Sequence, residues 1–283
     1  MLTALVAASL VALASAPSAL QSPLSDADAA VVSRIRGYAT RYVDTMQSVV
    51  AHERYEQSLT ARRATPRTTE LKSDVLSLRL AGGRETIWFR DVYEVDGRKV
   101  RDREDRLLRL LESNAPGRLD DLRRIAAEGA RFNLGSVPRT TNVPDLVFAY
   151  LTAGAGHITL SSPKDATIRG ERVRVFRFEE VGTPTIVRGT AGRDLPARGR
   201  VWVEPGSGAV VRSEVVLGDT TSTATTVVEF VAHPRVAVRV PQRMDETFRS
   251  PSELGVGTAT YSDLRVFGVN TAEQIRKPPP GAP

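Results

Sequence analysis

The chain has 283 residues, of which 41% are hydrophobic and 25% charged, as is typical of a globular protein, and this excludes wholesale disorder or a protein with several membrane spans. It contains no cysteine, so disulfides, zinc–thiolate sites and thiol nucleophiles are excluded. The net charge of +6 would suit nucleic acid, but the arginines alternate with acids, as in RDREDR at 101–106. We therefore expect no nucleic-acid partner.

The first 20 residues predict an export signal peptide. They form an apolar run that ends in small residues, with Ala14-Ser15-Ala16 as a cleavage site of the A-x-A type. No Lys or Arg precedes the apolar core, so an uncleaved N-terminal anchor is the alternative interpretation. We expect the mature protein to begin between Ser15 and Ser25. It would be periplasmic or secreted, with no stable membrane span after cleavage.

A long amphipathic helix is predicted from Ser25 to about residue 50. Ser25 and Asp28 have the spacing of a capping box, and apolar residues follow at helical spacing. The helix has a single apolar stripe, which must lie along another apolar surface. The sheet predicted downstream is the only surface large enough to cover it.

The clearest local signal is a hairpin in WFRDVYEVDGRKV, residues 88–100. Asp96-Gly97 is a two-residue turn of the kind that joins antiparallel strands. A turn at this place puts Glu94 opposite Lys99, a pair of opposite charge, and the aromatic residue 93 opposite the β-branched residue 100. Strands are predicted at about 50–61, 70–80 and 85–95.

A helical insertion at 103–153 interrupts the strands. Asp102 can cap a first short helix, Pro116 opens a second and Pro144 opens a third. The third helix is apolar around much of its surface. It is expected to cover one open end of the sheet.

From His157 onward the chain predicts strands in meander spacing, separated by Gly and Pro turns. The predicted strands are at 157–162, 166–181, 184–189, 198–204, 208–217, 222–233, 236–249 and 256–269. About ten or eleven antiparallel strands in all are too many for a flat sheet, so the sheet must curl. The Pro-rich tail at 278–283 has nothing to bury and is predicted to be disordered.

The segment VWVEPGSGAVVRSE, residues 201–214, resembles a hairpin of the LolA/LolB-like lipoprotein carriers and RseB-like sensors. It has an apolar strand with Trp202, an acid-Pro-x-x-Gly turn and a second strand through Val210 and Arg212. The closing ATYSDLRVF, residues 259–267, is similar to the last strand of such proteins, and DVYEVDG and RDREDRL resemble a branch of uncharacterised exported bacterial proteins.

This resemblance covers most of the chain after residue 25 in element order. It implies one domain at 25–277 with an α+β fold, in which a long N-terminal helix lies against a curled, unclosed antiparallel half-barrel. In the carriers, such a half-barrel has an apolar cavity that holds acyl chains.

Catalytic and metal-binding motifs are absent from the sequence. The three histidines, His52, His157 and His233, form neither an H-E-x-x-H motif nor an i, i+4 pair, and no G-x-S-x-G elbow is present. The acids at 91–105 alternate with arginines, which favours a surface ion-pair network over a calcium site. We therefore expect a protein that is not an enzyme and that uses no cofactor and no metal.

Two hypotheses for the function remain. In the first, the protein is a carrier or sensor that binds a lipid or lipoprotein in the cavity. In the second, it is a structural or interaction module of the cell envelope with a side-chain-filled core, and it binds another envelope protein through an Arg-rich face. A continuous apolar pocket of about 300–1,000 Å3 would favour the carrier. Its ligand would contact the large side chains Trp88, Tyr93, Leu146, Tyr150, Trp202, Phe230 and Tyr261.

Overall fold

The computed structural model describes residues 24–79, 86–100, 103, 106, 118–135, 141–189, 192–218 and 221–266. The predicted signal peptide, the turn at 81–83, most of the first helix of the insertion and the tail lie outside them. The helices are α1 (Asp26–Met46), α3 (Arg118–Ala130) and α4 (Leu146–Thr152). The strands are β1 (Val49–Ala61), β2 (Arg67–Arg79), β3 (Thr86–Val95), β4 (Arg98–Lys99), β5 (Ile158–Ile168), β6 (Glu171–Glu180), β7 (Ala197–Val203), β8 (Val210–Gly218), β9 (Thr223–His233), β10 (Val236–Arg249) and β11 (Glu253–Val266).

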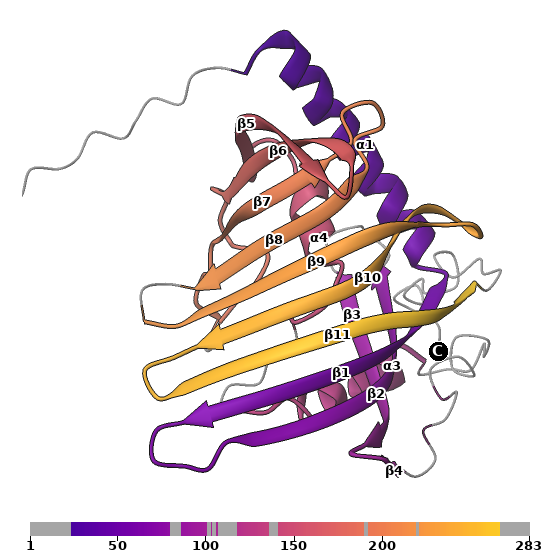
Figure 1. Ribbon diagram of the computed structural model, residues 1–283, viewed down its shortest axis with the longest axis vertical. Helices are drawn as coiled ribbons and strands as arrows, with labels where there is room; N and C mark the ends of the chain where they lie inside the picture. Colours follow the sequence, from indigo (N-terminus) through magenta and orange to yellow (C-terminus); the bar gives the residue numbers. More distant parts are fainter. Residues whose placement is uncertain are drawn as a thin grey trace, which may run out of the picture.

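The described strands form one antiparallel sheet of eleven strands (Figure 1), in the order β4-β3-β2-β1-β11-β10-β9-β8-β7-β6-β5. Strands that follow one another in the chain are paired, except β4 and β5, and the added pairing of β1 with β11 brings the first and last strands together in the middle of the sheet. The end strands β4 and β5 are not neighbours, so the sheet curls without closing. The predicted α+β half-barrel is therefore confirmed.

The predicted hairpin is present between β3 and β4. Asp96 and Gly97 both have positive φ angles, 48° and 76°, as a type I′ turn requires. Glu94 pairs with Lys99, and the backbone N of Val100 donates a hydrogen bond of 2.7 Å to the carbonyl of residue 93. The cross-strand register is thus the one that the sequence predicted.

Helix α1 begins at its predicted cap, because the Ser25 hydroxyl accepts a hydrogen bond of 3.2 Å from the backbone N of Asp28. It ends at Met46 and not near residue 50, because Val49 and Val50 already belong to β1. The helix contacts α4, β10, β1 and β2. Its buried apolar residues form the predicted single stripe, namely Val31, Ile35, Tyr38, Ala39, Tyr42, Val43 and Met46.

The turn between β7 and β8 packs directly on α1. Arg34 Nε donates a hydrogen bond of 2.8 Å to the carbonyl oxygen of Pro205. Gly208 has a φ of +74°, and a Cβ at this position would overlap the backbone of Arg34. Glycine is required here both for the left-handed backbone and for the close approach to the helix. The acid-Pro-x-x-Gly turn therefore has a structural role.

The strand predicted at 184–189 is wrong, because this segment lies in the loop between β6 and β7, where its one described bridge joins Arg188 and Asp194. Side-chain carboxylates accept hydrogen bonds from its backbone N–H groups. The N of Thr185 donates to Asp194 at 2.9 Å, and the N of Ile186 donates to Glu180 at 2.6 Å. These two backbone N–H groups are therefore hydrogen-bonded although no neighbouring strand pairs with the segment. The boundary between the two strands predicted at 157–162 and 166–181 also differs, because residues 166–168 belong to the first of them, β5.

The two described helices of the insertion pack at different places. Helix α3 lies against β3, where a Cβ on Gly129 would overlap the carbonyl oxygen of Arg90. Helix α4 contacts α1 and β8, and all but two of its seven residues are buried. Figure 1 shows α4 behind the sheet, on the side that the strands curl toward. This helix, which the sequence predicted as a cover for one open end, forms part of the central core.

Candidate functional site

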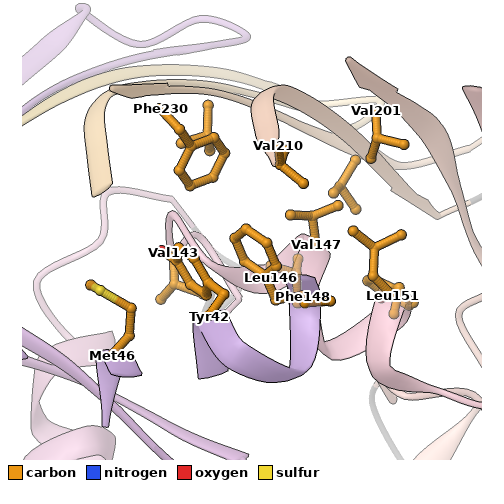
Figure 2. Packing of buried hydrophobic residues seen from close by; sticks show 14 of the residues in the cluster. Tyr42, Met46, Val143, Leu146, Val147, Phe148, Leu151, Val201, Val210 and Phe230 are labelled. Atoms are coloured by element: carbon orange, nitrogen blue, oxygen red, sulfur yellow. The ribbon is translucent and has the colours of Figure 1, made fainter. Parts of the chain in front are cut away.

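The concave interior, where a carrier would hold its ligand, is occupied by aromatic side chains from α1, α4 and the sheet (Figure 2). The rings of Tyr42 and Phe148 are stacked with centroids 3.5 Å apart and an interplanar angle of 13°. Phe230 of β9 meets Phe148 edge-on at 5.5 Å. Each of these side chains is at most 1% exposed. The helices thus contribute side chains that fill the concave interior.

A small cavity of about 30 Å3 remains beside this cluster, lined by Tyr42, Trp88 and Asp145 among others. The hydroxyl of Tyr42 is buried and has no hydrogen-bond partner among the described residues. Burial also raises the pKa of Asp145 above its ordinary value. A cavity of this size has room for about two water molecules.

A buried ion pair lies on the same side of the sheet, between β1 and β3. Arg90 donates from Nε and Nη2 to the carboxylate of Glu53 at 2.5 and 2.9 Å, and from Nη2 to the carbonyl of Asn142 at 2.8 Å. Tyr261 of β11 donates to the same carboxylate at 3.0 Å. Burial alone would lower the pKa of Arg90, but the charge of Glu53 and its hydrogen bonds raise it. The guanidinium of Arg90 therefore remains charged.

A second carboxylate continues this network. The hydroxyl of Tyr55 donates to Glu246 of β10, and Asn142 Nδ2 approaches Glu246 at 3.3 Å. The guanidinium of Arg90 lies 4.8 Å from the ring centroid of Tyr55, which joins the two halves of the network. Burial raises the pKa of Tyr55 well above its ordinary value, so this phenol stays protonated and donates. The network ties β1, β3, β10, β11 and the insertion together.

Five of the seven predicted ligand-binding residues lie in or against the interior cluster. Leu146, Tyr150 and Phe230 are buried in it, Tyr261 is buried beside the ion pair, and Trp88 is half-buried against the cluster. Tyr150 stacks on Phe178 with ring centroids 5.7 Å apart. The structure therefore brings these residues together as packing partners.

Tyr93 lies outside the interior, in a polar cluster with β1 and β2. Its hydroxyl is 3.2 Å from Nδ1 of His52, which is also 3.1 Å from the carboxylate of Asp74. Arg265 binds the same carboxylate at 2.7 Å. Tyr93 thus helps to hold polar side chains of three neighbouring strands and does not line the interior.

Trp202 also lies outside the interior. Its neighbours in β7, Val201 and Val203, are in the buried core, and strand alternation puts Trp202 on the opposite face. There the guanidinium carbons of Arg200 and Arg212 lie 5.1 and 5.3 Å from its ring. The sequence showed that Trp202 alternates with two valines but not which face of the sheet becomes concave.

A second histidine–carboxylate pair, His157 and Glu180, lies at the loop between β6 and β7. His157 Nε2 is 2.9 Å from Glu180, whose carboxylate also accepts hydrogen bonds from the backbone N of Ile186 at 2.6 Å and of Ala197 at 3.0 Å. The side chain of Glu180 is fully buried. This carboxylate therefore holds a long loop in place.

Sequence reasoning missed the buried polar network. Glu53 lies on the same face of β1 as Ala51 and Tyr55, so its inward direction could be read from the strand period. Its partner Arg90 and the second carboxylate, Glu246, carried no comparable signal. Within the part of the chain that the structure describes, no group of three or more His, Cys, Asp or Glu side chains is placed to hold a metal ion.

None of the described helices combines the length and the apolar character needed to cross a membrane.

The fold and the filled interior define the chain as an open α+β half-barrel. Neither a protein-family model nor a curated protein matches it. Among solved structures, a domain assigned to an outer membrane lipoprotein-sorting protein from Vibrio parahaemolyticus is similar over 89% of this chain and 100% of its own, with a TM-score of 0.41 and 14% identity.

Two further solved structures are similar. A DUF1329 family protein from Desulfovibrio piger matches 83% of this chain and 92% of its own, with a TM-score of 0.38 and 13% identity. A LolA superfamily protein from Nitrosomonas europaea matches 87% of this chain and 97% of its own, with a TM-score of 0.37 and 11% identity.

Proposed function

We propose that the chain is an exported, non-enzymatic interaction module of the cell envelope. Its half-barrel is filled by its own side chains, and it binds another protein through its surface. The observation that carries this proposal is the stack of Tyr42 on Phe148, 3.5 Å apart, in the space where a carrier would hold an acyl chain. The cavity left beside the stack is about 30 Å3. A ligand site usually needs about 300–1,000 Å3.

One larger hollow of the described surface, of about 540 Å3, is a poor candidate for a lipid. It lies over β1, β2 and β11 and is lined mainly by polar side chains such as Arg54, Glu56 and Thr258. Apolar ligands gain affinity from buried apolar area, so a polar hollow offers them little. This supports a protein partner over a lipid.

The positions of the histidines support a non-enzymatic role. His157 binds Glu180, a carboxylate already engaged by two backbone donors. His52 contacts Asp74, a carboxylate that also binds Arg265. Each of these carboxylates has a structural partner, and neither pair lies in the small interior cavity.

The test is lipid binding by the wild-type protein and by a variant with an emptied interior. We expect native mass spectrometry of gently purified protein to show no lipid, and a fluorescent fatty acid not to bind. Phe148→Ala removes one of the stacked rings and should create space for the probe. Gain of binding by this variant, with a native circular dichroism spectrum, would support the filled interior.

Stoichiometric lipid on the wild type, or saturable binding of the fatty acid by it, would overturn the proposal in favour of a carrier. N-terminal sequencing of the exported product tests the second part of the proposal, that the chain is exported. A first residue between Ser15 and Ser25 is expected, whereas a product that begins at Met1 would contradict cleavage.

A further inference from the structure

The outer face of β6, β7 and β8 carries a group of arginines around Trp202. The inward positions of these strands hold core residues such as Phe176, Phe178 and Val201. The outward positions alternate with them. We call five of these outward residues the arginine–tryptophan face, namely Arg177, Arg198, Arg200, Trp202 and Arg212.

Trp202 is held in a defined orientation on this face. The guanidinium carbons of Arg200 and Arg212 lie 5.1 and 5.3 Å from its ring centroid. Each guanidinium is also bound by a glutamate, since Arg200 is 2.7 Å from Glu214 and Arg212 is 3.6 Å from Glu229. The central part of the face is therefore ordered before any partner binds.

Two other arginines of the face have no such partner. Arg177 and Arg198 are exposed, and neither forms an ion pair with any residue that the structure describes. Arg177 lies directly opposite Arg200 in the register of β6 and β7, and Arg198 lies opposite Glu179. Like charges directly opposite each other destabilise a sheet, so the position of Arg177 is not favoured by its cross-strand neighbour.

The charge of this face is positive. Its four arginines are accompanied on the outward positions of β6–β8 by three acids, Glu171, Glu179 and Glu214, and Glu171 is itself paired with Arg239 of β10 at 2.6 Å. Because the cations are arginines, each presents a planar fork that can bind a carboxylate through two hydrogen bonds. The two guanidinium groups without an ion-pair partner, those of Arg177 and Arg198, are on adjacent strands, where one extended chain can contact both.

We propose that the arginine–tryptophan face binds an acidic segment of a protein partner. The inference rests on the proposed function and names the surface and the chemistry of its partner. Carboxylates of the segment bind Arg177 and Arg198, while the edge of the Trp202 ring provides apolar contact. Charge complementarity steers the encounter, and desolvation of the arginine–carboxylate pairs gives specificity.

A protein segment fits this face better than an anionic membrane. Glu179, Glu214 and Glu229 are interleaved with the arginines and would repel a continuous layer of phosphates. Trp202 is half-buried and lies against two guanidinium groups, so it does not project into a bilayer.

The test uses a fluorescent 12-residue peptide of alternating Glu and Gly, with a Gln and Gly peptide of the same length as the uncharged probe. Binding is measured by anisotropy on the full mature protein at low and at 0.3 M salt. We expect the wild type to bind the acidic peptide only. The double variant Arg177→Ala/Arg198→Ala should bind it at least tenfold more weakly.

A matched control removes two exposed arginines elsewhere, Arg63→Ala/Arg249→Ala, and has the same net charge as the double variant. It should bind like the wild type. Equal weakening in both variants, or no binding of the acidic peptide by the wild type, would overturn the inference. So would binding of vesicles of anionic phospholipid that depends on Arg177 and Arg198 while the peptide does not bind.

These failures are distinguishable from failure of the proposed function. If the peptide does not bind and the wild type binds no lipid, the module uses another surface. If the wild type binds fatty acid, the proposed function fails whatever the peptide does.

Discussion

The buried pair of Glu53 and Arg90 allows a sharp test of how the interior is held together. Their side chains are 0% and 6% exposed, and they share two hydrogen bonds, with a third from Arg90 to the backbone of Asn142. Arg90→Met keeps most of the side-chain length but leaves the carboxylate buried without its cation. Removing one partner of a buried pair costs about 3–5 kcal/mol, so we expect a loss of about 4 kcal/mol.

The assay is urea unfolding followed by circular dichroism, with a scan of thermal unfolding. A loss of about 4 kcal/mol corresponds to a melting temperature lower by about 10 °C in a domain of this size. The double variant Glu53→Gln/Arg90→Met leaves no unpaired charge and should be more stable than Arg90→Met alone. Arg54→Met is the control, because Arg54 pairs with Glu70 at the surface. A loss in Arg90→Met no greater than that in Arg54→Met would refute the reasoning.

Three further predictions concern the helices and the β7–β8 turn. Gly208→Ala should cost about 1 kcal/mol or more, because its φ is positive and its Cβ would overlap α1, whereas Gly206→Ala, with open space around it, should melt like the wild type. Ile35→Asp should cost at least about 3 kcal/mol by burying an unpaired charge, and exposed Ser33→Asp should not; equal melting of both would contradict the packing of α1. Burial raises the pKa of Asp145 in the folded state, so its contribution to stability is complete below the unfolded pKa of about 3.9 and is lost as the pH rises through the folded value. Asp145→Asn should therefore gain stability relative to the wild type between pH 4 and pH 7, and a difference in melting temperature that falls over this range would contradict the assignment.

The elements that the sequence predicted correctly depend on local rules. The type I′ turn at Asp96-Gly97 needs positive φ at adjacent residues, and the cap at Ser25 needs a hydroxyl three residues before a free backbone N–H. The segment at 184–189 has an apolar pattern too, but Glu180 and Asp194 satisfy its backbone from outside the segment. No local pattern shows that a distant carboxylate will take the place of a neighbouring strand.

The sequence by itself determined the described helices α1, α3 and α4, most of the strands, the curl of the sheet and the resemblance from which the half-barrel was inferred. Period-two alternation put Trp202 and Val201 on opposite faces, but it could not say which face becomes concave. Only the tertiary structure decided that Trp202 lies outside and that Phe148 fills the interior. It also joined Tyr261 to Glu53, residues that are 208 positions apart in the chain. The physical reason is that alternation is set by each strand alone, whereas burial and partner choice depend on the pairing of β1 with β11 and on the helices that the curled sheet encloses.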